Sequence, residues 1–225
     1  MAKRPVFVVS ENVALMQKVD VDFTYYNGFS VAQKQRCIES LHKAFLQQQQ
    51  GKRVLEISSK SKEALGVKLS AFNLTVKGKS GKPISVECMF QSSKVFEHGG
   101  PYTDLLYVTS REAKKDVRLK NSGKVIGFQF NGKKFSCEPK TMFYNWLYIN
   151  TLAQNKELTS DLIKYDAFTD IEFNPQKSLN CQAEAVAIYV SLVRQGLLEL
   201  ALKNKDDFLR IVYGEKKEND LFAES

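Results

Sequence analysis

The sequence predicts a helix-rich α+β fold with a small antiparallel β component, and three observations support this prediction. Apolar residues recur at helical spacing in several long segments, and one central segment has the pattern of a β-hairpin. No internal repeat and no linker rich in Pro, Gly and Ser divides the chain. Because 225 residues with 43% hydrophobic side chains can supply a core, we expect one domain spanning residues 1–225.

The helices are marked by capping residues as well as by periodicity. Ser30 with Gln33, and Thr109 with Glu112, have the spacing of capping boxes at helix starts. Gly196 is expected to weaken or break the long helix near the end of the chain. The expected helices cover residues 31–50, 85–96, 111–120, 141–155, 160–165, 181–203 and 207–213, and the charged tail beyond them is expected to fray.

Strands are expected at residues 5–9 and 54–58 and in a hairpin over residues 125–137. The hairpin is predicted because Asn131-Gly132 accepts the positive φ angles of a type I′ turn between two strand-like runs. The lysine-rich residues 77–82 lack the spacing of a Walker loop, so we expect an exposed hairpin or linker there.

Charge and composition limit the classes of function. The formal net charge of +8 favours polyanionic partners such as nucleic acids or nucleotides. The four cysteines are far apart, without a CxxC pair, and only two histidines are present, so we expect no metal site, no disulfide scaffold and no cofactor. No apolar signal sequence and no membrane-length apolar run is visible, so we expect a cytoplasmic protein without a membrane partner.

The first candidate site is a polar stripe formed by Glu87, Gln91 and Lys94. Spacings of four and three residues place these side chains on one face of the expected helix, with Glu87 and Lys94 about 10 Å apart along its axis. Two long side chains at that separation can converge on a ligand. An ordinary solvated helix face would have the same pattern.

The second candidate site is the segment of residues 165–175. If this segment is extended, Asp170, Glu172 and Asn174 line one side, and the apolar residues between them anchor the other. Carboxylates on an anchored loop are suited to general acid–base catalysis. The alternative is a simple turn before Pro175.

Three further features could contact a ligand. The hydroxyl-rich and basic residues 58–62 suit a phosphate, although a solvated loop has the same composition. Asn180 is expected to cap the following helix, whose first turn could also bind phosphate or ribose. Trp146 is expected in the core, whereas Tyr148 points elsewhere on the helical wheel and could stack on a base. Motifs of Cys-His, G-x-S-x-G or G-x-G-x-x-G chemistry are absent.

Two stretches of the sequence resemble the NADAR (YbiA-like) domain family. Residues 69–74, LSAFNL, are similar to the family's Ser-Asn-Phe element, and residues 86–96, VECMFQSSKVF, are similar to its Glu-His-Tyr-Phe-Gln-Ala-x-Lys motif. This chain departs from the pattern at Ala71 and Cys88, where the family usually has Asn and His.

The rest of the chain resembles the branch of this family that is paired with DarT-type toxins. The similarity continues from Trp146 through residues 166–175, DAFTDIEFNP, to residues 178–183, SLNCQA, and in all it spans about residues 54–200. It implies a YbiA-like fold and an antitoxin that removes ADP-ribose from the exocyclic amine of guanine in DNA. It also implies three partners: ADP-ribosylated DNA, the product ADP-ribose and the paired toxin.

The resemblance assigns roles to the candidate residues. Cleavage of a ribosyl C–N bond requires stabilisation of positive charge at the anomeric carbon and a proton for the leaving amine. Lys94 is predicted to act as a nucleophile that forms an imine or as an electrostatic catalyst, Glu87 as its partner in proton transfer, and Asp170 as the carboxylate nearest the ribose. One pocket is expected to join them. The predicted substrate-binding residues are Ser58, Lys60, Ser61, Ser70, Phe72, Phe90, Gln91, Thr169, Glu172 and Asn180.

Two other functions remain compatible with the sequence. A basic helical protein could neutralise a toxin or coat nucleic acid without catalysing a reaction. YbiA-like relatives are linked to N-glycosidic cleavage of riboflavin intermediates, so a small-molecule N-glycosidase is the second alternative. The pairing of an amine with carboxylates favours a hydrolase.

Overall fold

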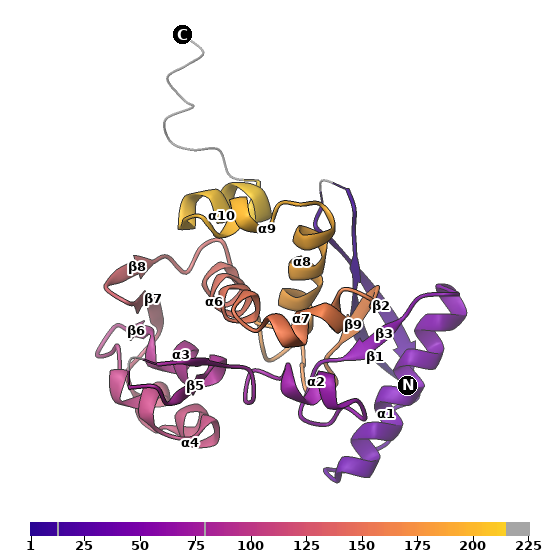
Figure 1. Ribbon diagram of the computed structural model, residues 1–225. Coiled ribbons are helices and arrows are strands. Elements are labelled where there is room, and N and C mark those ends of the chain that lie inside the picture. Colours follow the sequence, from indigo (N-terminus) through magenta and orange to yellow (C-terminus); the bar gives the residue numbers. More distant parts are fainter. Residues whose placement is uncertain (13, 79, 215–225) are drawn as a thin grey trace.

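A four-stranded sheet with the order β2-β1-β9-β3 organises one side of the molecule. The computed structural model describes residues 1–12, 14–78 and 80–214 (Figure 1). Strand β1 is antiparallel to both β2 and β9, whereas β9 is parallel to β3. The helix-rich α+β class expected from the sequence is confirmed, and the charged tail at 215–225 lies outside the described residues.

The described residues form short strands and mostly short helices. The strands are β1 (Ala2–Val9), β2 (Met16–Phe23), β3 (Val54–Glu56), β4 (Thr75–Lys77), β5 (Pro83–Ser85), β6 (Lys94–Phe96), β7 (Val125–Phe130), β8 (Lys133–Phe135) and β9 (Ala167–Thr169). The helices are α1 (Val31–Gln48), α2 (Ala64–Lys68), α3 (Val86–Ser92), η1 (Thr103–Tyr107), α4 (Ser110–Lys115), α5 (Arg118–Asn121), α6 (Met142–Ala153), α7 (Lys156–Leu162), α8 (Gln182–Arg194), α9 (Leu198–Leu202) and α10 (Lys205–Tyr213).

Both faces of the four-stranded sheet are covered, which explains why residues 5–8 of β1 are all buried. On one face, the apolar stripe Ile38, Leu41 and Phe45 of α1 packs on the sheet. On the other face β1 contacts α8. Strands that are buried on both faces are continuously apolar, as residues 5–8 are.

A three-stranded sheet, β6-β7-β8, forms the opposite side of the molecule. The predicted β7–β8 hairpin is confirmed, and its turn has φ angles of 47° at Asn131 and 76° at Gly132. Phe128 of this sheet stacks on Phe143 of α6 with ring centroids 4.5 Å apart. The aromatic contacts therefore attach the hairpin to the central helix.

Helices α6 and α8 lie between the two sheets and form most of the main core (Figure 1). The break expected at Gly196 is confirmed, because α8 ends at Arg194 and Gly196 has a φ of 68°. Both capping residues lie where they were predicted, but only the second forms a full capping box. The Ser30 hydroxyl accepts a hydrogen bond from the Gln33 amide, and Thr109 and Glu112 cap each other reciprocally at α4.

Three predicted helices have different bounds. The helix expected over 85–96 ends at Ser92, and Lys94 instead begins β6, because this short segment pairs with β7. The helix expected over 111–120 is divided into α4 and α5, since Asp116, with φ −56° and ψ 128°, is not helical and its carboxylate accepts the Arg118 amide. The helix expected over 160–165 begins earlier and ends at Leu162.

Candidate active site

The parallel pairing of β3 with β9 brings two candidate loops to one edge of the four-stranded sheet. Glu56 pairs with Thr169 at the carboxyl ends of both strands, so residues 57–61 and 170–174 leave the sheet side by side. Gln182, at the start of α8, donates to the Ile57 carbonyl at 2.5 Å and accepts from the Ala71 amide at 2.7 Å. Crevices outside the carboxyl ends of strands are common ligand sites in α/β sheets.

The carboxylate of Glu56 is buried and holds the start of the second loop. Its Oε2 accepts from the Thr169 hydroxyl at 2.6 Å, and its Oε1 accepts from the Ile171 amide at 2.8 Å. Burial raises the pKa of Glu56, although its hydrogen bonds with Ser58, Thr169 and Ile171 act in the opposite direction. Glu56 therefore contacts the residues on both sides of Asp170.

His42 of α1 extends this network. Its Nε2 lies 2.8 Å from the Thr169 hydroxyl, and burial lowers the pKa of His42 to about 4. The imidazole is therefore neutral at physiological pH. Because the Thr169 hydroxyl donates its only proton to Glu56, Nε2 of His42 must be the donor to Thr169.

Asp170 is buried at this edge and is 9% exposed. Its Oδ1 accepts from the amides of Glu172 and Phe173, at 3.0 and 3.2 Å. Burial raises the pKa of Asp170 well above its usual range, and the charges of Glu56 and Glu172 raise it further. This environment favours the protonated carboxyl, which can donate a proton to a leaving group.

Lys94 lies at the start of β6, and its ammonium is 4.8 Å from the centre of the Phe90 ring. Burial lowers the pKa of Lys94, the Glu87 carboxylate opposes this shift, and the Lys114 ammonium lowers the pKa further. Glu87 is itself buried and accepts from the Gln91 side-chain amide at 2.9 Å. An amine in these surroundings is more readily deprotonated than an exposed lysine, as a nucleophile requires.

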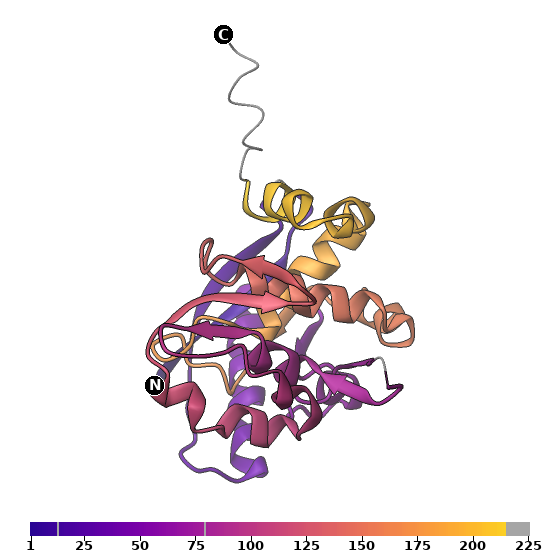
Figure 2. The same ribbon diagram turned by 90° about the vertical axis from the view of Figure 1, so that its left-hand side faces the viewer.

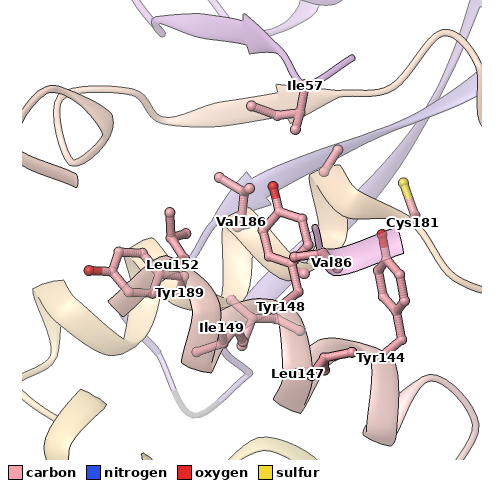
Figure 3. Close-up of a cluster of buried hydrophobic side chains, with 14 of the residues drawn as sticks. Ile57, Val86, Tyr144, Leu147, Tyr148, Ile149, Leu152, Cys181, Val186 and Tyr189 are labelled. Atoms are coloured by element: carbon pink, nitrogen blue, oxygen red, sulfur yellow. The ribbon is translucent and has the colours of Figure 1, made fainter. Parts of the chain in front are cut away.

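Tyr144 of α6 lies between the Lys94 region and the Asp170 region. Burial raises the pKa of Tyr144 well above its usual range, and the carboxyl groups of Glu87 and Asp170 are among the neighbours that act in the same direction. Figure 3 shows its hydroxyl pointing toward the sulfur of Cys181, the residue that precedes α8. Electrostatic contacts thus run from Lys94 through Glu87 and Tyr144 to Asp170.

The polar stripe of the first candidate site differs from its prediction. Because the helix ends at Ser92, Lys94 does not share a helical face with Glu87, and the separation expected along a helix axis does not apply. Glu87 and Gln91 do belong to α3, but both are buried rather than solvated. The side-chain oxygen Oε1 of Gln91 is buried without a hydrogen-bond partner among the described residues, so it is free to accept one from a ligand.

The second candidate site also differs, because β9 ends at Thr169 and the following residues turn. Asp170 is buried by this turn, whereas Glu172 is exposed and pairs with Lys34 of α1 at 3.2 Å. Asn174 accepts the amide of Gln176 in a turn of its own. The extended arrangement, in which Asp170, Glu172 and Asn174 would line one side, is therefore not adopted, and the alternative of a turn before Pro175 is confirmed.

Three of the predicted substrate-binding hydroxyls are buried and take part in local hydrogen bonds. Ser58 and Ser61 accept backbone amides within their own turn, and Ser70 donates to the Val67 carbonyl at 2.9 Å. Lys60 is half-buried, and Phe72 is half-buried beneath Lys114. Their roles in substrate binding remain predictions.

Of three predictions about aromatic and capping residues, those on Tyr148 and Asn180 are wrong and the one on Trp146 holds in part. Tyr148 is fully buried, and its hydroxyl donates to the Leu69 carbonyl, so it cannot stack on a base (Figure 3). Trp146 is only partly buried, although it packs against the core as expected. Cys181 rather than Asn180 occupies the cap position of α8, because Cys181 is the residue with extended backbone angles before the first turn.

Four residues of this site were not predicted from the sequence: Glu56, His42, Tyr144 and Gln182. An acidic residue inside the apolar run Val54-Leu55-Glu56-Ile57 is a signal for a buried carboxylate and could have identified Glu56. Nothing local distinguishes the others, because their contacts come from distant parts of the chain.

Two surface cavities of about 540 Å³ each lie away from these residues. One is lined by residues of α9, α10 and the segment after β1, and the other by residues near α2 and α7. Neither is lined by Lys94, Glu87 or Asp170, so a pocket that joins these residues stays a prediction. In the part of the chain that the structure describes, no three His, Cys, Asp or Glu side chains are grouped to hold a metal, and no helix could cross a membrane.

Comparison with known proteins gives one family. A family model described as DarT1-associated NADAR antitoxin matches residues 2–221. No curated protein matches the chain.

Proposed function

Because this chain belongs to the DarT1-associated NADAR antitoxin family, we propose that it hydrolyses the N-glycosidic bond between ADP-ribose and guanine in DNA. On this proposal it reverses the modification made by a DarT1 toxin. The observation that carries the proposal is the environment of Lys94. Its amine has a lowered pKa, lies over the Phe90 ring and is influenced by the buried carboxylate of Glu87.

The chemistry assigns a role to each group. Neutral Lys94 attacks the anomeric carbon, the C–N bond breaks, and its electron pair moves to the guanine amine, which takes up a proton. Opening of the ribose ring gives an imine with Lys94, and water hydrolyses the imine to release ADP-ribose. Glu87 accepts the proton that Lys94 loses, and protonated Asp170, beside the ribose, donates the proton that the guanine amine takes up.

An oxocarbenium route would use the same residues with Lys94 as an electrostatic catalyst. Borohydride reduction during turnover, followed by mass spectrometry, distinguishes the two routes. A covalent adduct on Lys94 supports the imine, and turnover without any adduct supports the oxocarbenium ion.

The proposed activity is tested with an oligonucleotide that carries one ADP-ribosylated guanine. The wild-type protein is expected to release ADP-ribose and restore guanine, whereas Lys94→Ala should reduce the rate by at least about 10³-fold. Lys43→Ala, on the exposed surface of α1, is the matched control and should retain full activity. Near-normal turnover by Lys94→Ala would remove Lys94 from the mechanism.

The same assay separates the alternatives. A protein that only binds nucleic acid or the toxin would leave the modified oligonucleotide intact at any concentration. A small-molecule N-glycosidase would leave it intact but would cleave a free nucleotide intermediate of the riboflavin pathway.

A further inference from the structure

We propose that the exposed face of α4, formed by Arg111, Lys114 and Lys115, binds the phosphate backbone of the DNA next to the modified guanine. This inference rests on the proposed function, because it names the part of the protein that would recognise the polymer rather than the ADP-ribose group. The three residues follow the i, i+3, i+4 spacing, so their side chains share one side of the helix. Ala113, on the opposite side, is buried.

Neighbouring acids form no ion pair with the cations of this face among the described residues, although Glu112 keeps its negative charge beside them. The carboxylate of Glu112 is occupied by the amide and hydroxyl of Thr109, at 2.8 and 2.7 Å. Asp104 and Asp116 both pair with Arg118, at 2.6 and 2.9 Å. Within the described residues, the three cations of the α4 face form no ion pair, so they are available to an external anion.

The α4 face lies at the border of the candidate active site. The Ser110 hydroxyl bonds to the Ser85 hydroxyl at 2.8 Å and to the Phe72 carbonyl at 2.9 Å, and Ser85 caps α3. These bonds fix the start of α4 against the helix that carries Glu87. Figure 1 shows α4 beside α3 and β5, and Figure 2 shows it at the opposite end of the molecule from α9 and α10.

Lys114 connects the face to the reacting amine. Its ammonium lies 5.1 Å from the centre of the Phe72 ring, and its charge acts on Lys94. A strand that follows the α4 face would therefore pass next to Lys94. Exposed Tyr107, just before α4, is available to contact a neighbouring base or sugar.

The dimensions suit a short stretch of a polynucleotide. From Arg111 to Lys115 the helix rises about 6 Å, and a DNA strand carries one phosphate per about 3.4 Å of rise. The face therefore spans about two phosphates. Neutralising phosphates releases counterions, which makes such binding strongly dependent on salt.

The test compares two substrates that share the modified base but differ in backbone. The double variant Arg111→Gln/Lys115→Gln removes two exposed cations that have no partner among the described residues. Lys133→Gln/Lys134→Gln, on exposed β8, removes the same charge elsewhere. Each protein is assayed with the ADP-ribosylated oligonucleotide and with ADP-ribosylated guanine mononucleotide, between 50 and 300 mM salt.

The α4 variant is expected to have a KM for the oligonucleotide raised on the order of tenfold at about 150 mM salt. The slope of log KM against log salt should fall by about one to two. Its kcat/KM for the mononucleotide should equal that of the wild type. Equal effects in the β8 control, or an equal loss on the mononucleotide, would overturn the proposal.

Failure of the proposed function gives a different pattern, in which the wild-type protein cleaves neither substrate. The α4 face is then tested by fluorescence anisotropy with an unmodified oligonucleotide. Salt-dependent binding that the α4 variant loses and the β8 control keeps would support the face. Equal binding by all three proteins would exclude it.

Discussion

The carboxylate of Glu56 accepts hydrogen bonds from the two residues that flank Asp170, so it fixes the position of that residue through the backbone. Glu56 is also an acidic neighbour of Asp170, and both burial and this neighbour raise the pKa of Asp170. The arrangement supplies both the position and the protonation state that proton donation requires.

Glu56→Gln is expected to lower the pKa of Asp170, because the substitution removes a neighbouring negative charge and keeps the shape of the side chain. Asp170 would then lose its proton at lower pH. The alkaline limb of the profile of kcat/KM against pH should therefore shift to lower pH, measured with the modified mononucleotide. Glu199→Gln, exposed on α9, is the control. An unshifted profile in Glu56→Gln would show that Asp170 does not act as the acid.

Lys114→Gln is expected to raise the pKa of Lys94, because it removes a like charge that disfavours the ammonium form. Only the neutral amine attacks carbon, so the rising limb of the profile should move to higher pH, and turnover of the mononucleotide should fall at neutral pH. The neighbouring exposed Lys115→Gln serves as control. If both variants behave alike, Lys114 has no specific effect on Lys94.

His42 makes the stability of the fold sensitive to acid. Its pKa is about 4 in the folded protein, against about 6.5 in an unfolded chain. In this interval the unfolded state binds more protons, so the free energy of unfolding falls as the pH decreases from 6.5 to 4. His42→Gln can still donate to Thr169 but does not titrate.

Protonation of His42 is therefore expected to lower the free energy of unfolding by about 2–3 kcal/mol between pH 7 and pH 4.5, at about 1.4 kcal/mol per pH unit. Urea unfolding of the wild type and His42→Gln at both pH values measures it. The raised pKa of Asp170 gives a pH dependence of opposite sign in both proteins, which cancels in the comparison. Parallel losses in the two proteins would contradict the assignment to His42.

Tyr148→Phe tests whether this residue is structural. Loss of its hydroxyl leaves the buried Leu69 carbonyl without that donor, which is expected to lower the free energy of unfolding by about 1–3 kcal/mol. The KM for the modified oligonucleotide should stay the same, because Tyr148 is fully buried. A raised KM with unchanged stability would instead indicate that Tyr148 contacts the substrate.

Features determined by local sequence were predicted well. The Asn131-Gly132 turn, the capping residues Ser30 and Thr109 and the break at Gly196 each depend on a few adjacent residues. Apolar periodicity likewise located α1, α6 and α8. The errors occurred where tertiary contacts decide the structure. Residues 94–96 continue an apolar helical pattern, but pairing with β7 makes them a strand.

The candidate site was predicted in part for the same reason. Lys94, Glu87 and Asp170 came from motifs within single segments, whereas the contacts around them join segments far apart in the sequence. Glu56 lies 113 positions before Thr169, which it contacts. Without long-range information, neither the buried network with His42 nor the place of Tyr144 between the two regions could be derived.

The placement of β9 between β1 and β3 has a consequence for synthesis of the protein. Residues 167–169 supply the strand between β1 and β3. The edges of β1 and β3 that face β9 therefore have no partner until about three quarters of the chain has been synthesised. Pairings between such distant segments form late. On the proposed function, a newly made molecule would therefore become active only after its final third has folded into place, and a chain that ends before residue 167 should be inactive.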